Sequence, residues 1–183
     1  MSAAASKTVF IVLFRGVGGA TQLPTAPLRK ALGDAGFGNV STYINSGNAV
    51  LSSGLAAGET HARIAKIVKS GFGFEKEIML VSWTDWERLI DENPFPEAVD
   101  QPTTLHAFVL QTVPAESAVA ALVRRLAPHE HLVVRGNFLY LHVPHGFSAS
   151  KLPPVIDRVL NTVSTARNWR TVLALGKLAS EKG

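Results

Sequence analysis

Residues 42–50, TYINSGNAV, carry the clearest local signal in the chain and decide the fold. Strand-forming residues lead into and out of a tip made only of Asn, Ser and Gly. These three residue types tolerate positive backbone dihedrals and hydrogen-bond to their own backbone. The stretch therefore predicts a β-hairpin whose strands run at about residues 40–44 and 48–52.

The residues around this hairpin predict the rest of a first half. Residues 8–14, TVFIVLF, are apolar on both faces and predict a central strand covered on both sides. A glycine-rich loop at 15–22 leads into a helix that Pro24 or Pro27 begins and Gly36 ends. A second helix at about 59–70 and a strand at 77–82 complete the order strand, helix, strand, strand, helix, strand.

The same order recurs in the second part of the chain. The expected elements there are a strand at 105–111, a helix at 114–126, a strand at 132–134, a strand at 138–143, a helix at 150–160, a weak strand at 162–165 and an extra helix at about 168–178. We therefore predict an α+β protein of two tandem ferredoxin-like (βαββαβ) halves, residues 1–82 and 103–183, joined by an acidic connector with a short helix at 83–102.

Composition limits the functional classes. The chain has 183 residues, of which 46% are hydrophobic, enough for a packed core. It has no cysteine, which excludes disulfides, thiolate catalysis and Cys-ligated zinc or iron–sulfur sites. The apolar run Val9–Phe14 is too short for a signal peptide or a membrane span, so we expect a cytoplasmic protein without a membrane partner.

Charge is unevenly distributed along the chain. Residues 1–82 hold 8 Lys/Arg against 4 Asp/Glu, residues 83–102 hold 1 against 6, and residues 103–183 hold 9 against 4. One interpretation is that the acidic connector folds against the two basic halves and cancels part of their field. The other is a basic surface for an anionic ligand.

The predicted topology brings two polar segments together. In a βαββαβ half the first and third strands are antiparallel neighbours, so the loop at 15–21 should approach the hairpin tip at 45–48. Glycine N–H groups and an Arg side chain are suited to a phosphate or carboxylate. The alternative is structural, with Arg15 bonding loop carbonyls and the Asn side chains capping the turn. The residues of this candidate ligand site are Arg15, Gly16, Gly18, Gly19, Asn45, Ser46, Gly47 and Asn48.

Alternating aromatic residues in the second half suggest another surface. We expect Phe138, Tyr140 and His142 to share a sheet face with His106 and Phe108, opposite the helices. Sheets that bind single-stranded nucleic acid stack bases on such residues. The alternative is that this face is buried against the other half or the connector.

A third candidate site combines Lys151 with Arg167, both suited to binding an anion. Beside them Asn168 is a natural helix N-cap, and Trp169 is expected to pack the last helix. Neither the His142/His145 pair nor the cluster at 129–131 has a further ligand at zinc spacing, so we predict no metal and no cofactor.

The predicted function is therefore binding of a small anionic ligand or a regulatory partner at the edge formed by Arg15 and residues 45–48. One alternative is a single-stranded nucleic-acid-binding module. Another is an enzyme acting on a phosphorylated or carboxylated metabolite, with His106 or His142 as its base.

The motifs also resemble a known family. They are LFRG at 13–16, GG at 18–19, LP at 23–24, TYINSGN at 42–48, NPFP at 93–96, LYLH at 139–142, SKL at 150–152 and RNWRT at 167–171. In this order they are similar to the bacterial family called domain of unknown function 1697. The resemblance implies a duplicated α/β architecture and no established activity. The loop at 15–22 is two residues shorter than is usual there and lacks an Asn and a basic residue, which implies weaker ligand binding if those side chains contact one.

Overall fold

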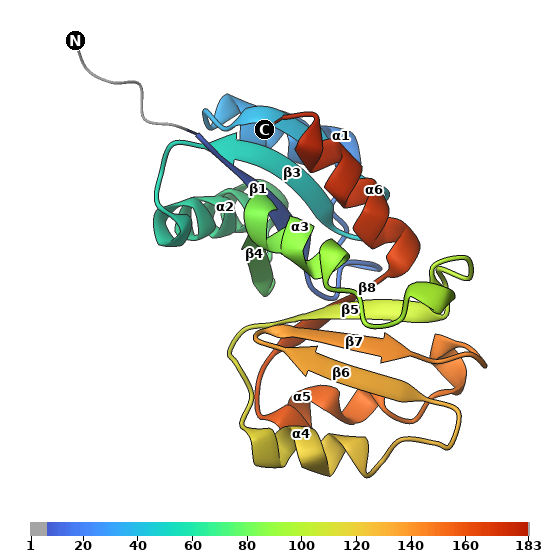
Figure 1. The fold of residues 1–183 in the computed structure, drawn as a ribbon. Coiled ribbons are helices and arrows are strands. Elements are labelled where there is room, and N and C mark those ends of the chain that lie inside the picture. Colours follow the sequence, from blue (N-terminus) through green and yellow to red (C-terminus); the bar gives the residue numbers. More distant parts are fainter. Residues whose placement is uncertain (1–6, 183) are drawn as a thin grey trace. The chain divides into compact units, whose positions relative to one another are not determined.

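The computed structural model describes residues 7–182, and it is an α+β structure with two four-stranded antiparallel sheets (Figure 1). The chain forms two compact units. One runs to Arg88 and resumes at Ala174, and the other spans Leu89–Leu173. These bounds differ from the predicted halves, because α3 (Trp83–Asp91) and α6 (Trp169–Ser180) each contribute residues to both units.

The first unit has its strands in the order β2-β3-β1-β4. Its elements are β1 (Thr8–Phe14), α1 (Thr25–Asp34), β2 (Gly38–Thr42), β3 (Asn48–Ser53), α2 (Ala57–Phe72) and β4 (Ile78–Ser82). The central strand β1 pairs antiparallel with β3 on one side and with β4 on the other. The first unit therefore contains all six elements predicted for residues 1–82, in the predicted order.

Both helices of the first unit pack on one face of its sheet. Leu28 and Leu32 of α1 and Ile64 and Val68 of α2 are buried in a core with Phe10 and alternate strand residues. The residues of β1 that point the other way, among them Ile11, are also inaccessible to solvent. Strand β1 is thus covered on both faces, as its unbroken apolar sequence predicts.

The second unit has the strand order β6-β7-β5-β8 and repeats the element order of the first. Its elements are β5 (Leu105–Leu110), α4 (Glu116–Val123), β6 (His131–Arg135), β7 (Phe138–His142), α5 (Ile156–Leu160) and β8 (Ser164–Asn168). Short 3₁₀ turns lie at Pro96–Ala98, Phe147–Ala149 and Pro153–Val155. A core of Leu, Ile, Val and Phe side chains joins α4 and α5 to one face of this sheet.

Several predicted elements differ in extent, among them the hairpin strand at 40–44 and the helix at 150–160. The hairpin strand β2 ends at Thr42, so the reversal spans residues 43–47, and Ile44 within it has a φ of 45°. The helix predicted over 150–160 is replaced by a 3₁₀ turn followed by the five-residue α5. Pro153 and Pro154 explain this difference, since neither has an N–H to donate to a helical hydrogen bond.

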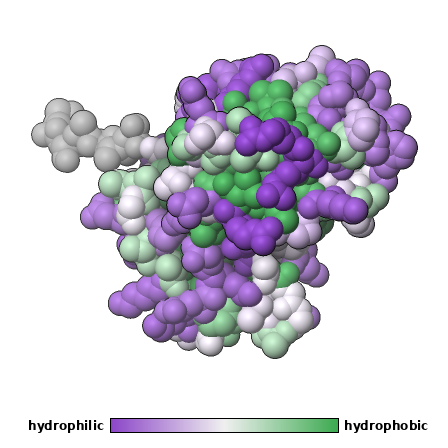
Figure 2. Space-filling view, turned by 90° about the horizontal axis from the view of Figure 1, so that it is seen from below, coloured by the Kyte–Doolittle hydropathy of each residue, from purple (hydrophilic) through white to green (hydrophobic). Residues whose placement is uncertain are grey.

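Some apolar surface is exposed. Figure 2 shows a face of the molecule on which hydrophobic residues gather among hydrophilic ones. Ile44 and Val113 are exposed large hydrophobic residues, with exposed fractions of 52% and 69%. Within residues 7–182, no helix combines the length and the apolar character needed to cross a bilayer.

The hairpin reversal approaches the central strand most closely at Gly47. The Phe14 N–H donates to the Gly47 carbonyl oxygen at 2.9 Å. A Cβ atom at position 47 would lie 2.8 Å from Cγ2 of Val17 and 2.9 Å from Cβ of Phe14, and the φ of Gly47 is +76°. Only glycine meets both conditions without strain.

We expect Gly47→Ala to destabilise the protein by about 2–4 kcal/mol, the sum of a left-handed backbone penalty and a steric displacement. Urea unfolding with a constant m-value measures this change. Gly73→Ala is the matched control, because Gly73 has a φ of +77° and nothing within 4 Å of its added Cβ. Equal losses for the two variants would show that the close approach to Phe14 contributes nothing.

Candidate functional site

The loop after β1 and the hairpin reversal lie at the same end of the first sheet, as the topology predicts. Leu13 is the register partner of Asn48. The next residue of β1, Phe14, donates its N–H to Gly47 on one side of the strand. On the other side, the Arg15 N–H donates to the Glu77 carbonyl oxygen at 2.9 Å. Arg15 therefore leaves the sheet between the reversal and the segment that precedes β4.

Arg15 lines an open depression of about 510 Å³ together with Gly16, Glu75, Lys76 and Glu77. The Lys76 ammonium donates to the Gly16 carbonyl oxygen at 2.5 Å, which fixes the lysine beside the loop. Two cationic side chains thus share this depression with two carboxylates. The arrangement provides donors suited to a carboxylate or a phosphate.

Polar groups of the glycine loop hydrogen-bond to one another, whereas the sequence predicts that its N–H groups face a ligand. Gly18 and Thr21 exchange backbone hydrogen bonds of 3.3 and 3.0 Å, and the Thr21 hydroxyl also donates to the Gly18 carbonyl oxygen at 3.1 Å. Gly16 and Gly19 have positive φ values of 62° and 54°, which explains the glycine at each of these positions. The Gly18 N–H is therefore hydrogen-bonded within the loop, and its role in ligand binding stays a prediction.

The polar residues of the hairpin reversal have a structural role. The Asn48 side-chain amide donates to the Tyr43 carbonyl oxygen at 3.1 Å and to the Ser46 hydroxyl at 2.9 Å, and Asn48 is buried. Asn45 instead lines a second depression, of about 190 Å³, with Gly18 and residues 22–24. The single predicted site is therefore divided into an Arg15 depression and an Asn45 depression.

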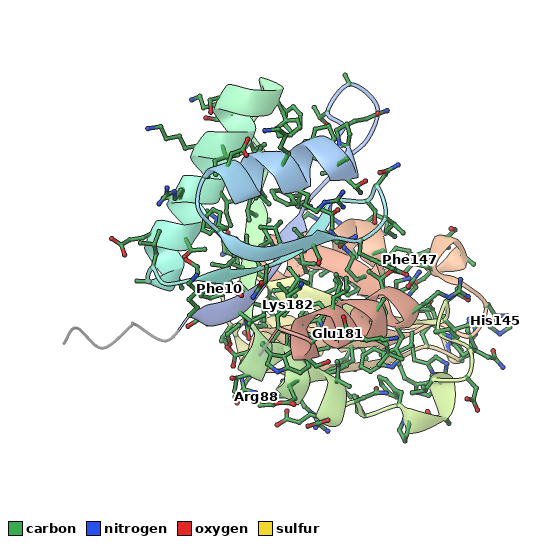
Figure 3. The ribbon with its side chains drawn as sticks, turned by 90° about the horizontal axis from the view of Figure 1, so that it is seen from above. Phe10, Arg88, His145, Phe147, Glu181 and Lys182 are labelled. Carbon is green, nitrogen blue, oxygen red and sulfur yellow. The ribbon has the colours of Figure 1, made fainter. Side chains whose placement is uncertain are left out.

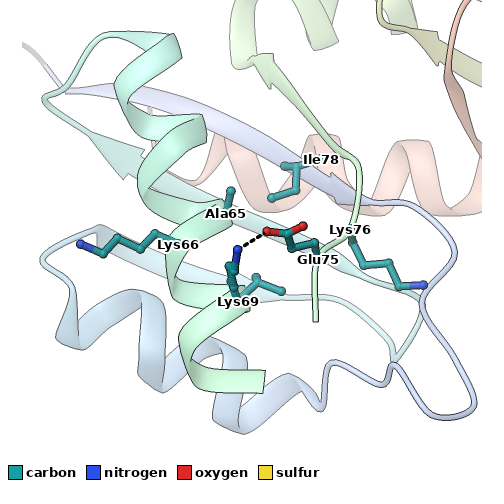
Figure 4. Close-up of a pocket in the computed structure, with 7 residues that line it drawn as sticks. Ala65, Lys66, Lys69, Glu75, Lys76 and Ile78 are labelled. Atoms are coloured by element: carbon teal, nitrogen blue, oxygen red, sulfur yellow. Dashed lines mark ion pairs between the residues drawn. The ribbon is translucent and has the colours of Figure 1, made fainter. Parts of the chain in front are cut away.

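A cavity that the sequence analysis missed lies between α2 and β4 (Figure 4). Its volume is about 320 Å³, and its lining residues are Ala65, Lys66, Val68, Lys69, Glu75, Lys76 and Ile78. The one sequence feature that points to this cavity is the spacing of Lys66 and Lys69, which places both lysines on the same side of α2. The register between helix and strand that opens the cavity is not visible in the sequence.

An ion pair crosses this cavity. The Lys69 ammonium lies 2.6 Å from a Glu75 carboxylate oxygen, and both side chains are more than two-thirds exposed. Hydrogen bonding to Glu75 raises the pKa of Lys69, and hydrogen bonding to Lys69 lowers the pKa of Glu75. Exposed pairs of this kind contribute little to stability, so either partner is available to a competing charge.

Lys151 and Arg167 occupy different environments in the second unit. Lys151 is exposed, and it follows Ser150, whose hydroxyl accepts the Leu152 N–H at 3.2 Å. The Arg167 guanidinium donates to the Thr165 hydroxyl at 2.9 Å and to the Ala166 carbonyl oxygen at 2.8 Å. Burial lowers the pKa of Arg167 to about 10. An anion site at these two residues stays a prediction.

The helix cap predicted beside Arg167 is confirmed. The Thr171 N–H donates to the Asn168 side-chain oxygen at 3.0 Å, at the start of α6. Trp169, the first residue of that helix, is almost completely buried. Both residues therefore have structural roles, as their positions in the sequence indicate.

The predicted aromatic face of the second sheet is correct for β7, whose Phe138, Tyr140 and His142 lie opposite the helices, and wrong for β5. Strand register pairs Phe108 with Leu139 and His106 with Leu141, which puts these aromatic residues on the helix-covered face. Tyr140 lies on the other face and is fully buried, with its hydroxyl donating to the Leu89 carbonyl oxygen at 2.9 Å. The aromatic residues are divided between the two faces and do not form one platform for bases.

The two histidines considered as bases are both in the second unit, whereas Arg15 is in the first. His106 stacks on Phe147, a residue labelled in Figure 3, with ring centroids 4.0 Å apart. Burial lowers the pKa of His106 to about 4. Burial also lowers the pKa of His142, which packs beside Phe95. Within residues 7–182, no three His, Asp or Glu side chains are grouped so that they could hold a metal ion.

Comparison with known proteins gives a family and a fold. The family model described as "Protein of unknown function (DUF1697)" matches residues 8–140. The solved structure of the conserved bacterial protein SP0830 from Streptococcus pneumoniae is similar, with a TM-score of 0.71 and 21% sequence identity. The alignment covers 96% of this chain and 99% of that one, so the likeness in fold extends over both units. The search of curated proteins found no match.

The buried imidazole of His106 predicts a loss of stability in acid. Its pKa is about 4 in the folded state and about 6.5 in an unfolded chain, so the unfolded state binds the extra proton as pH falls from 6.5 to 4. We expect the free energy of unfolding to fall by about 2–3 kcal/mol more in wild type than in His106→Phe between pH 7 and pH 4.5. Urea unfolding at the two pH values measures this, and equal losses would contradict it.

Proposed function

The chain belongs to the DUF1697 family of proteins of unknown function, and we therefore propose its function from its own geometry. We propose that the protein binds a small anionic ligand at the Arg15 end of the first sheet. The observation that carries the proposal is that Arg15 and Lys76 line one open depression of about 510 Å³.

Two cationic groups and two carboxylates line the depression, and one of the carboxylates is paired with a group outside it. Glu75, one of its two carboxylates, is already paired with Lys69. A charge-assisted hydrogen bond to a carboxylate or phosphate contributes roughly 1.5–3 kcal/mol, and a guanidinium can form two such bonds in parallel. Glu77, the other carboxylate, opposes the binding of an anion.

The backbone around the depression supports a preformed site. Arg15 is held through its own N–H to Glu77, and the preceding residue Phe14 is held to Gly47. Lys76 is held through the Gly16 carbonyl oxygen. A site that is ordered before binding loses less conformational entropy when the ligand arrives.

The two alternatives have less support. The register of β5 and β7 divides the aromatic residues on which a nucleic-acid interface was based. Burial lowers the pKa of both histidines considered for catalysis, which makes each a weaker base. We therefore propose binding without chemistry, either of a metabolite or of an anionic group on a regulatory partner.

The finer architecture belongs to the same proposal. We propose that the two units are copies of one ferredoxin-like βαββαβ module, linked through the acidic segment 83–102. The equivalent strand orders β2-β3-β1-β4 and β6-β7-β5-β8 support the duplication. A cytoplasmic location in a bacterium fits a chain without cysteine and the bacterial origin of the similar structure.

Arg15→Ala should weaken binding of inorganic phosphate by about tenfold or more at low ionic strength, because a charge-assisted hydrogen bond is lost. Isothermal titration calorimetry measures the affinity, and thermal unfolding shows that the variant is folded. Lys30→Gln is the matched control, because this substitution also removes one positive charge. Lys30 is an exposed lysine of α1 that pairs with Asp34. A similar loss in both variants would mean that net charge, and not this depression, governs binding.

A further inference from the structure

The Arg15 depression and the cavity between α2 and β4 are neighbours. Glu75 and Lys76 line both of them. Figure 4 shows the Lys76 side chain extending away from the cavity toward the loop after β1, where its ammonium bonds Gly16. The segment 75–76 is therefore a common wall between a cationic depression and a second cavity.

The second cavity differs in chemical character. Val68 and Ile78, two of its lining residues, are buried in the core, and Ala65 is a partly buried helix residue. The charged groups of Lys69 and Glu75 are at its exposed side, as their exposed fractions of 68% and 74% show. Lysine side chains commonly lay their methylene stems along such apolar surface while the ammonium stays in water. The cavity thus has an apolar interior and a charged rim.

We propose that these two cavities form one site for an amphipathic anion with a carboxylate or phosphate head and a short unbranched hydrocarbon chain. The head contacts Arg15 and Lys76, and the chain lies between α2 and β4 against Ala65, Val68 and Ile78. This inference rests on the proposed function, because it names the class of anion that the Arg15 depression takes.

Volume and charge both fit this ligand class. A cavity of about 320 Å³ is at the lower end of the range for small-molecule sites, which suits a short chain and excludes a large cofactor. Glu75 lines both cavities, so its carboxylate repels an anionic head at Arg15 and Lys76. The Glu75→Gln variant should therefore bind the ligand severalfold more tightly.

A homologous series of anions tests the inference. We would measure the affinities of acetate, butyrate, hexanoate and octanoate by calorimetry at fixed pH and ionic strength, all below their aggregation concentrations. Each added methylene should tighten binding by between about twofold and fourfold, because each removes apolar surface from water. An alkyl phosphate series of the same chain lengths distinguishes a phosphate from a carboxylate head.

Ala65→Leu fills the apolar cavity and suits a helix. It should abolish the dependence of affinity on chain length. Ala62→Leu is the control, because Ala62 is an exposed residue of the same helix that is not part of the lining. Its chain-length dependence should equal that of wild type.

The outcomes separate the two proposals. Arg15-dependent acetate or phosphate binding without any effect of chain length would overturn the amphipathic ligand and leave the anion site standing. Chain-length dependence that survives Arg15→Ala but not Ala65→Leu would support the apolar cavity and overturn the proposed anion head site. Chain-length dependence that survives Ala65→Leu would place the hydrocarbon elsewhere and overturn the inference.

Discussion

The contact between β1 and the hairpin reversal is the constraint on which the candidate site depends. Phe14 donates its N–H to Gly47 where the two backbones meet, and no side chain fits at position 47. This contact fixes where β1 ends, and therefore where Arg15 leaves the sheet. On the other side of β1, the Arg15 N–H donates to the Glu77 carbonyl oxygen and holds the loop beside the segment that carries Lys76.

Exposure explains why the charged groups here suit binding better than catalysis. Arg15 and the Lys69–Glu75 pair are at the surface, where water screens charges and a ligand can exchange with an existing partner. The buried titratable groups of the second unit behave in the opposite way, since burial holds His106 neutral at physiological pH. An imidazole stacked on Phe147 is a packing residue, although its chemistry alone makes it a candidate base.

The sequence predicted much of the local structure because local signals are short-range. Asn, Ser and Gly at residues 45–48 specify a reversal through their own backbone preferences. Asn168 caps α6 by accepting a hydrogen bond from the N–H of Thr171, three residues further along the chain. The sequence also predicted that Arg15 lies near the reversal, because this placement requires only that β1 and β3 are antiparallel neighbours. The doubled proline at 153–154 is a local signal of the same kind, because neither residue can donate a helical hydrogen bond and α5 begins only at Ile156.

By itself, the sequence determined the order of strands and helices, the double-sided burial of β1, and the end of the sheet where Arg15 and the reversal meet. Only the tertiary structure decided that Phe108 faces the helices with Leu139 and that a cavity opens between α2 and β4. The physical reason is register. Alternation along a strand defines two faces, but a shift of one residue against its neighbour exchanges them, and that alignment is set by packing between segments far apart in the chain.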